Sequence, residues 1–167
     1  MLYSGISGEP VELGDQIGSG REGAAYRIIG SRGIAKIYHD PTPELAGKVE
    51  VMARAVPLLL RLKEEMMMHL GWPAKPLYKH PDKTGFVGFG MRAAPEGSVP
   101  IDLITQFPPN ETAPVLTMRQ KIKVLMDFSH LTSELHIIGV IVADWNGSNL
   151  LVSETGRITM IDVDAYG

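Results

Sequence analysis

The sequence predicts an α+β fold in which a mostly antiparallel sheet with one helix precedes a mostly helical part. Short β-type runs alternate with glycine turns before residue 40, and helical periodicity first appears at Pro43. A linker rich in Pro and Gly, at 94–100, then precedes a second and longer amphipathic pattern. We therefore expect one lobe at 1–92 and a second region, beginning with a hinge, at 93–167.

Composition narrows the classes of protein to which the chain can belong. Its 167 residues are 44% hydrophobic and 21% charged, which is ordinary for a globular domain. A net charge of −3 without a Lys/Arg run argues against a nucleic-acid partner, and the absence of cysteine excludes thiolate metal sites. No secretory signal or membrane-length apolar run is visible, so we expect a cytoplasmic protein with no membrane partner.

Three β-type runs come first, at 11–17, 24–29 and 34–38, and the turn "GSRG" makes antiparallel hairpins the natural connection. From Pro43 the spacing of apolar residues predicts a helix that Pro57 interrupts, followed by a second helical segment that ends near Gly71. The Met66–Met68 run is interpreted as core packing. The helix presents one apolar face, which comprises Leu45, Val49, Met52 and Val56.

The second half begins with predicted strands around 77–78 and in "GFVGFGMRA". A long helix follows the linker and ends at Gly139, and after it "VIVADWN", "NLLVS" and "RITMID" are predicted to be strands or extended segments, with "ETG" as a hairpin turn. The long helix carries apolar residues at helical intervals, which are Ile122, Leu125, Met126, Leu131 and Leu135.

Two features of the sheet region are candidates for phosphate binding. Gly18, Gly20 and Gly23 have GxGxxG spacing between two β-type runs, which leaves backbone N–H groups free to approach phosphate oxygens. A purely structural turn is the alternative, and a strand rather than a helix follows. Lys36 lies in mid-strand, where it either points to solvent or aims an ammonium group under the glycine loop.

Polar side chains also interrupt the apolar runs near the end of the chain. Asp144 and Asn149 lie in "VADWNGSNLLV", and Asp162 follows another apolar run. A carboxylate and an amide are hard oxygen ligands that suit Mg²⁺. The alternative is that these residues form turns, since "DWNGSN" is rich in turn formers.

Taken in order, these features resemble the protein-kinase superfamily: a glycine loop, a strand lysine, a long helix ending in "LH", DxxxxN and a strand ending in Asp. The stretches "GSGREGAAYRI", "GWP" and "DWNGSN" are most similar to a bacterial branch of eukaryotic-like kinases. Members of that branch are often encoded beside von Willebrand-type and protein-phosphatase partners. The resemblance covers nearly the whole chain, from about Val11 to Gly167.

The resemblance implies a kinase-like fold with ATP and Mg²⁺ as cofactors and a protein substrate. Region 1–92 would be the N-lobe, and 93–167 would be the hinge and a partial C-lobe. The glycines would cover the ATP phosphates, and "GMRAAP" would be the hinge that meets the adenine. Lys36 would bind the α/β-phosphates, and Met91 would lie beside the adenine pocket. Asp144 would be the catalytic base, and Asn149 and Asp162 would bind Mg²⁺.

Several positions depart from the family pattern. Val142 and Ala143 stand where many kinases carry His-Arg, and Asn146 replaces a lysine that usually contacts the transferring phosphate. Asp162 is followed by Val163 and Asp164, and Asp164 could add a second carboxylate near the metal. The helix glutamate that should pair with Lys36 is either Glu44 or Glu50.

The end of the chain at Gly167 is five residues past Asp162, where a full kinase would continue into its activation segment. We therefore expect either a fragment or a minimal relative, with an apolar face of the long helix exposed for self-association. The leading hypothesis is an ATP-dependent phosphotransferase acting on Ser/Thr of a protein. The alternatives are a non-catalytic nucleotide-binding module and a small-molecule kinase.

Overall fold

The computed structural model describes residues 1–108, 110–143 and 146–165. Its residues form two compact units, and each is described by itself. The first unit comprises Met1–Leu62 and Trp72–Ala93, and the second comprises Lys63–Gly71 and Ala94–Gly167.

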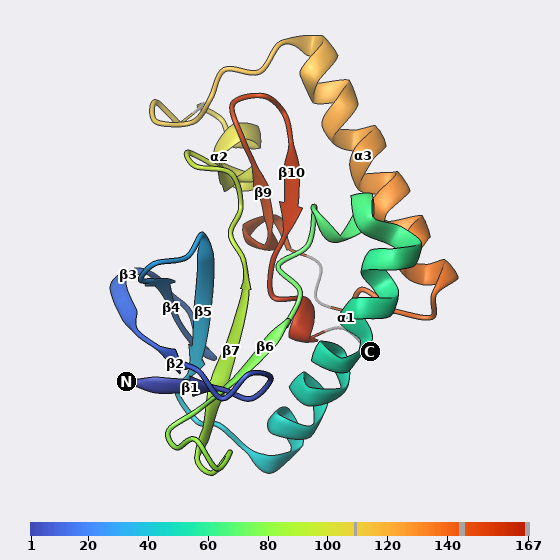
Figure 1. Cartoon of the computed structure of the whole chain (residues 1–167). Coiled ribbons are helices and arrows are strands. Elements are labelled where there is room, and N and C mark those ends of the chain that lie inside the picture. The colour runs from blue at the N-terminus through green and yellow to red at the C-terminus, as the bar shows by residue number, and fades with distance from the viewer. Residues whose placement is uncertain (109, 144–145, 166–167) are drawn as a thin grey trace. The chain divides into compact units, whose positions relative to one another are not determined.

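The first unit is built on a seven-stranded sheet in which all neighbouring strands are antiparallel (Figure 1). The strand order is β2-β1-β6-β7-β5-β4-β3. The bounds of the strands are Leu2–Ser4 for β1, Pro10–Val11 for β2, Leu13–Ser19 for β3, Gly23–Ile28 for β4, Gly33–Tyr38 for β5, Lys75–Tyr78 for β6 and Phe86–Arg92 for β7.

Most of the predicted strands of this sheet are confirmed, but its beginning differs. The run predicted at 11–17 is divided between β2 and β3, and the β3–β4 pairing has two register shifts. The strand β1 was not predicted, because it has only three residues and no visible alternation. Its partners lie far along the chain, with Tyr3 opposite Tyr78, and local sequence carries no signal of such a pairing.

The two faces of the sheet pack against different side chains. One face holds a buried cluster of Val11, Ala35, Leu77 and Val87. The other holds a cluster that comprises Tyr38, Val49 and Phe89, and Val49 belongs to the helix α1. Because Lys36 and Tyr38 are two residues apart on β5, the Lys36 side chain lies on the helix-covered face.

The helix α1, Pro43–Met67, corrects the prediction of a break at Pro57. Helical structure continues through the proline, and the non-helical residue is Lys63, with φ −143° and ψ 47°. A proline inside a helix costs about 3 kcal/mol. Burial of the apolar face around it, including Met52, Ala53 and Leu59, offsets this cost. The kink at Lys63 is also where the chain passes from the first unit to the second.

The second unit combines helices with a small antiparallel sheet of order β10-β9-β8 (Figure 1). The helix α3 begins with a capping box between Thr117 and Gln120, and Gly139 adopts φ +82° just beyond its end. The bounds are Val99–Pro100 for β8, Ile101–Thr105 for α2, Met118–Ile137 for α3, Gly147–Asn149 for the 3-10 turn η1, Leu150–Val152 for β9, Ile158–Met160 for β10 and Val163–Ala165 for η2.

Two features of this unit differ from the sequence prediction. The linker at 94–100 ends in a strand and is followed by a short helix, neither of which was predicted, because both are too short to show periodicity. The described part of "VIVADWN" contains no strand. The strands predicted in "NLLVS" and "RITMID" are confirmed as β9 and β10, and Gly156 in the turn between them has φ +75°.

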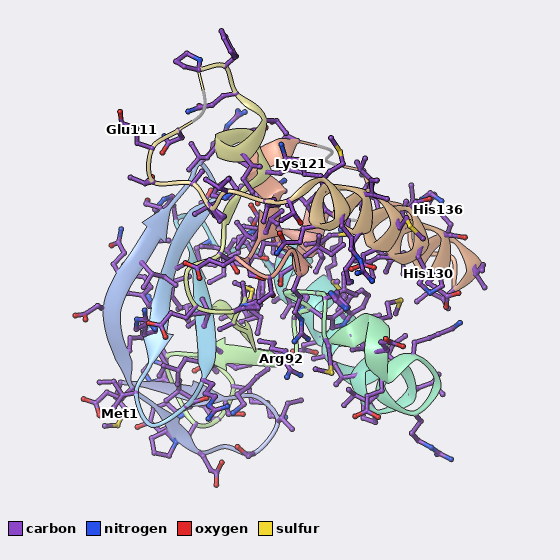
Figure 2. All side chains as sticks on the ribbon, turned by 90° about the horizontal axis from the view of Figure 1, so that it is seen from above. Met1, Arg92, Glu111, Lys121, His130 and His136 are labelled. Carbon is purple, nitrogen blue, oxygen red and sulfur yellow. The ribbon has the colours of Figure 1, made fainter. Side chains whose placement is uncertain are left out.

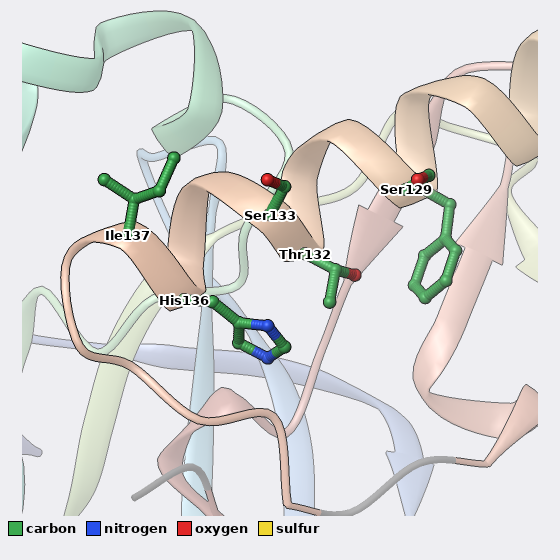
Figure 3. A pocket seen from close by; sticks show the side chains of 6 residues that line it. Ser129, Thr132, Ser133, His136 and Ile137 are labelled. Carbon is green, nitrogen blue, oxygen red and sulfur yellow. The ribbon is translucent and has the colours of Figure 1, made fainter.

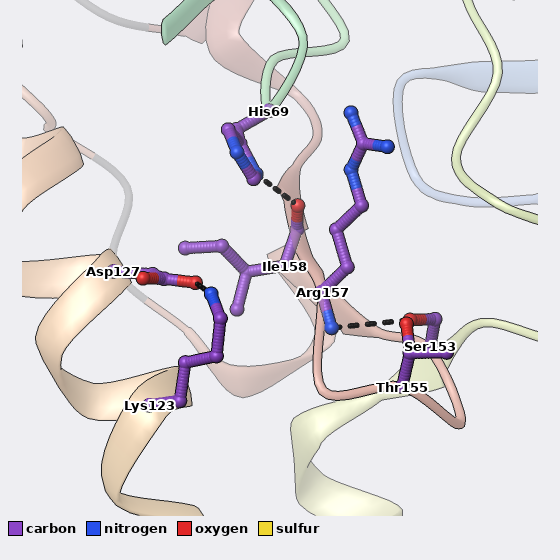
Figure 4. A network of polar contacts seen from close by, with 7 residues as sticks. All are labelled: His69, Lys123, Asp127, Ser153, Thr155, Arg157 and Ile158. Atoms are coloured by element: carbon purple, nitrogen blue, oxygen red, sulfur yellow. Dashed lines mark hydrogen bonds and ion pairs between the residues drawn. The ribbon is translucent and has the colours of Figure 1, made fainter. Parts of the chain in front are cut away.

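Polar contacts hold the β9–β10 hairpin within its unit (Figure 4). The backbone N–H of Arg157 donates to Ser153 Oγ at 3.1 Å, and a ring nitrogen of His69 lies 2.9 Å from the carbonyl oxygen of Ile158. The backbone of Leu70 also forms a parallel bridge with Met160. The segment after the kink in α1 is therefore bound to the hairpin that ends just before Asp162.

None of the helices in the described part of the chain is both long enough and apolar enough to cross a bilayer.

Candidate functional site

The loop between β3 and β4 is a tight turn that His39 holds in place. The N–H of Gly20 donates to the carbonyl of Gly23 at 2.8 Å. The backbone N–H of His39 donates to the carbonyl of Glu22 at 2.9 Å, and its Nε2 lies 3.2 Å from the carbonyl oxygen of Gly20. These contacts fix the path of the predicted glycine loop.

The three glycines of the predicted motif meet different surroundings. A Cβ on Gly23 would lie 2.3 Å from the carbonyl oxygen of Ile37, so packing requires glycine at that position. Among the described residues, a Cβ on Gly18 would have no neighbouring atom within 4 Å, and one on Gly20 would meet only the Gly23 carbonyl, at 4.0 Å. Neither Gly18 nor Gly20 has a positive φ. The described structure thus leaves the backbone at 18 and 20 open to close approach.

Lys36 is buried, with 6% of its surface exposed, which contradicts the alternative that it points to solvent. Its Nζ lies 5.3 Å from the ring centroid of Tyr38 and 5.9 Å from that of Phe89, within the range of cation–π attraction. Nζ also forms an ion pair with Glu22 Oε2 at 3.3 Å. A lysine ammonium is rarely buried without such partners, because its desolvation is costly.

Glu22 is a partner of Lys36 that the sequence alone did not indicate. It stands inside "GSGREG", between two of the motif glycines, where a charged residue looks like an ordinary solvated turn residue. The pairing with Lys36 spans the turn and strand β4, so only the folded hairpin brings the two charges together.

The two glutamates proposed as partners of Lys36 make other contacts in this structure. Glu50 accepts a hydrogen bond from the Tyr78 hydroxyl at 2.5 Å and one from Arg54 Nη2 at 3.1 Å. Burial, reinforced by the bond to Glu50, raises the pKa of Tyr78 to about 12. Glu44 lies at the start of α1, where hydrogen bonds from its own backbone N–H and from Thr42 lower the pKa of its carboxyl group.

Met91 lies near the end of β7, opposite Ile34 of β5. Its side chain is partly buried and packs on the cluster around Tyr38 and Phe89. Met91 therefore shares the helix-covered face with Lys36, since alternate residues of a strand point to the same side. The strand ends one residue later, at Arg92, and the first unit ends at Ala93.

In the second unit, Asn146 caps the turn η1. Its Oδ1 accepts the N–H groups of Ser148 at 3.0 Å and Asn149 at 3.2 Å. This use of a short side-chain amide explains an asparagine at the position where the resemblance implies a lysine.

Asn149 and Asp162, the two predicted Mg²⁺ ligands, come from adjacent stretches of backbone. The N–H of Ile161 donates to the carbonyl of Asn149 at 2.9 Å, directly beside Asp162. Asn149 and Asp164 are buried, and Asp162 has φ +55°, an uncommon conformation for a residue other than glycine. Such strain is concentrated at functional sites.

The donor set of this region fits a magnesium ion. An amide oxygen and one or two carboxylates are the protein ligands that Mg²⁺ commonly takes, with water and phosphate completing its shell. Within the described residues, no group of three or more His, Asp or Glu side chains is arranged as a metal site. Asp144, predicted to be the catalytic base, lies outside the described residues.

Asp102 of α2 is a second residue that sequence reasoning missed. A Cβ on Gly147 would lie 1.7 Å from Asp102 Oδ1, so glycine at 147 makes room for this carboxylate beside the DxxxxN segment. The only sign of this contact in the sequence is Gly147, and a glycine there is already expected because "DWNGSN" is rich in turn formers.

A surface hollow of about 550 Å³ lies along the C-terminal half of α3 (Figure 3). Of the predicted site residues that the structure describes, none lines it. His136 lines the hollow, whereas His130, labelled with it in Figure 2, does not. The lining comprises Phe128, Ser129, Thr132, Ser133, His136 and Ile137.

Comparison with known proteins adds an independent observation. The chain is 28% identical over 167 residues, or 96% of its length, to a protein named protein kinase YegI from Escherichia coli strain K12. The protein of the same name from E. coli O157:H7 is also 28% identical, over 99% of the chain. These matches support a kinase-like relationship.

The chain spans about a quarter of the length of these relatives, 24% and 25%. No family model matches it. The first unit, a curled antiparallel sheet with one main helix, is compatible with a kinase-like N-lobe. Lys36 belongs to the first unit and Asp162 to the second, and their convergence on one ligand stays a prediction.

Proposed function

We propose that this chain is the nucleotide-binding core of an ATP-dependent phosphotransferase of the Ser/Thr protein-kinase kind. The burial of Lys36 carries the proposal. An ammonium group with 6% exposure, beside a glycine turn that is open at 18 and 20, is costly for the fold and useful for binding phosphate. The similarity to proteins named protein kinase YegI supports the same activity.

In this proposal the predicted site residues keep the roles that the resemblance implies. Lys36 binds the α/β-phosphates under the backbone of Gly18 and Gly20, and Met91 contributes to the adenine pocket. Asn149 and Asp162 hold Mg²⁺, which neutralises charge on the phosphates when it is bound. Asp144 orients the hydroxyl group of a protein substrate and accepts its proton.

One observation favours a second candidate, a nucleotide-binding module without catalysis. Asn146 is engaged in capping η1, so the side chain at that position brings no positive charge to a transferring phosphate. Loss of one such charge removes transition-state stabilisation without abolishing nucleotide binding. The two candidates therefore agree on binding and differ on transfer.

Nucleotide binding is tested by thermal unfolding of wild type and Lys36→Met in the presence of ATP, with and without Mg²⁺. At a ligand concentration of about one hundred times Kd, binding adds about 2.7 kcal/mol of stability, which raises Tm by several degrees. We expect this shift in wild type with Mg²⁺ and its loss in Lys36→Met. Lys79→Met, which changes an exposed lysine of the same unit, should keep it. A wild type that ATP does not stabilise would contradict the proposal.

Transfer is tested with radiolabelled ATP and a generic Ser/Thr protein substrate, comparing wild type with Asp144→Ala. Label on the substrate that disappears in the variant, with ATP binding retained, is the result expected of a kinase. Binding in both proteins with transfer in neither would instead identify the non-catalytic module.

A further inference from the structure

His39 contacts the loop between β3 and β4 through both its backbone and its ring. Its backbone N–H donates to the Glu22 carbonyl at 2.9 Å, one step beyond the last paired residues of β4 and β5, Gly23 and Tyr38. Its ring nitrogen Nε2 lies 3.2 Å from the Gly20 carbonyl oxygen. Because a carbonyl oxygen only accepts, this contact requires a proton on Nε2. The backbone bond fixes the place of the residue, and the ring then orients the Gly20 carbonyl.

The His39 ring approaches the loop from the face of the sheet opposite to Lys36. The backbone bond of His39 continues the β4–β5 ladder, and successive residues of a strand point to opposite faces. Ala35 belongs to the buried cluster on one face, and Lys36 lies on the other, helix-covered face. His39 is four residues after Ala35 and therefore shares the face of Ala35.

This placement turns one backbone amide toward the Lys36 face. The peptide bond between Gly20 and Arg21 is trans, so its carbonyl and its N–H point in opposite directions. With the carbonyl directed to His39, the Arg21 N–H is directed to the other face. The Gly20 N–H is already bonded to the Gly23 carbonyl, whereas the Arg21 N–H has no hydrogen-bond partner in the part of the chain that the structure describes.

We propose that His39 is a positioning residue of the nucleotide site, whose ring holds the Gly20 peptide so that the Arg21 N–H donates to a phosphate oxygen of the ligand. This inference rests on the proposed function. A backbone N–H that is oriented before the ligand arrives loses less conformational entropy on binding, and turns of this kind bind anions through such groups. The effect of His39 is therefore confined to ligands that carry phosphate.

The test is calorimetric titration of Mg-ATP and of adenosine into wild type, His39→Leu, His39→Gln and His80→Leu. Leucine removes the donor, whereas the side-chain amide of glutamine replaces it. We expect His39→Leu to raise the Kd for Mg-ATP about three- to tenfold, the effect of losing one hydrogen bond, and His39→Gln to resemble wild type. His80, an exposed histidine of the same unit, is the matched control and should leave this Kd unchanged. The Kd for adenosine should be the same in all four proteins.

The outcomes separate this inference from the proposed function. Equal Kd values of wild type and His39→Leu for Mg-ATP would overturn the inference and leave the proposed function standing. Equal weakening of Mg-ATP and adenosine by His39→Leu would also overturn it, because a general structural role has that effect. Failure of wild type to bind Mg-ATP would instead remove the proposed function and this inference with it.

Two measurements on wild type keep the inference testable if a variant does not fold. Nitrogen-15 correlation spectra of the His39 ring show which ring nitrogen carries the proton, and a proton on Nε2 is expected. A ring protonated only on Nδ1 would overturn the inference, because Nε2 could then not donate. The backbone amide resonance of Arg21 should shift on addition of Mg-ATP and not of adenosine, and an Arg21 resonance that bound Mg-ATP leaves unchanged would overturn the inference as well.

Discussion

At the scale of single residues, the loop between β3 and β4 uses glycine for two different reasons. Gly23 is glycine because a Cβ there would collide with the carbonyl of Ile37. Gly20 has open space where a Cβ would be and no positive φ, so the fold does not require it to be glycine. A ligand that approaches the backbone closely is a physical reason for glycine at such a position.

Alanine substitutions separate these two reasons. Gly20→Ala should leave the free energy of unfolding unchanged or raise it by up to about 1 kcal/mol, because alanine restricts the unfolded chain. It should weaken Mg-ATP binding by on the order of tenfold, about 1.4 kcal/mol. Gly23→Ala should lower the free energy of unfolding by about 1–3 kcal/mol through overpacking. Urea unfolding and ATP titration measure both quantities, and equal destabilisation by the two variants would contradict this account.

At the scale of elements, a polar contact joins α1 to the sheet. Tyr78 at the end of β6 donates to Glu50 on α1, and its ring packs edge-on against Phe86. Trp72 adds a second link, since its indole N–H donates to the carbonyl of Met52 at 3.0 Å. These contacts orient the helix that the predicted kinase-like site requires beside Lys36.

The Tyr78 contact predicts a dependence of stability on alkaline pH. The folded pKa of about 12 lies above the ordinary value of 10, so folding favours the protonated phenol. Its contribution is complete below pH 10 and is lost as pH rises toward 12. Tyr78→Phe should therefore be destabilised by about 1.5 kcal/mol at neutral pH, the low end for a hydrogen bond to a charged group, because Glu50 is partly exposed.

Urea midpoints of wild type and Tyr78→Phe between pH 8 and about pH 12 provide the measurement, with Tyr26→Phe as a control in the same sheet. The difference between wild type and Tyr78→Phe should shrink above pH 10. A difference that stays constant across this range would show that the phenol does not titrate as the contact requires.

At the scale of the whole molecule, α3 presents apolar side chains to solvent. Met118, Ile122 and Leu125 are 71%, 51% and 64% exposed, and they recur at the spacing of one helical face. The hollow of Figure 3 lies farther along the same helix. In an antiparallel, two-fold pair of α3 helices, the exposed apolar residues in the N-terminal half of each helix would face the hollow in the C-terminal half of the other.

We therefore expect the protein to self-associate through α3, as the sequence analysis also expected. Sedimentation velocity over a range of concentrations should show a dimer that Leu125→Glu dissociates. Val51→Glu on α1, where the side chain is 65% exposed, is the matched control and should leave the dimer intact. A monomer at every concentration, or equal loss of dimer in both variants, would contradict this expectation.

The sequence by itself determined the kinds and order of most elements, because those depend on neighbours along the chain. Alternation and turn glycines located β4, β5 and β7, and apolar spacing located α1 and α3. The resemblance to kinases made Asn149 and Asp162 a candidate pair of Mg²⁺ ligands, and the hairpin between them brings the backbone beside Asp162 to Asn149.

Only the tertiary structure decided which charges are buried and what they meet. The sequence around Lys36 does not distinguish a side chain that faces water from one on the helix-covered face of the sheet. Glu22 pairs with Lys36 only once β4, which lies between them in the chain, has folded against β5. Burial around Pro57 likewise outweighed its helix-breaking tendency, and the non-helical residue of α1 is instead Lys63. In each case residues distant in the chain supply the deciding free energy, which no local pattern records.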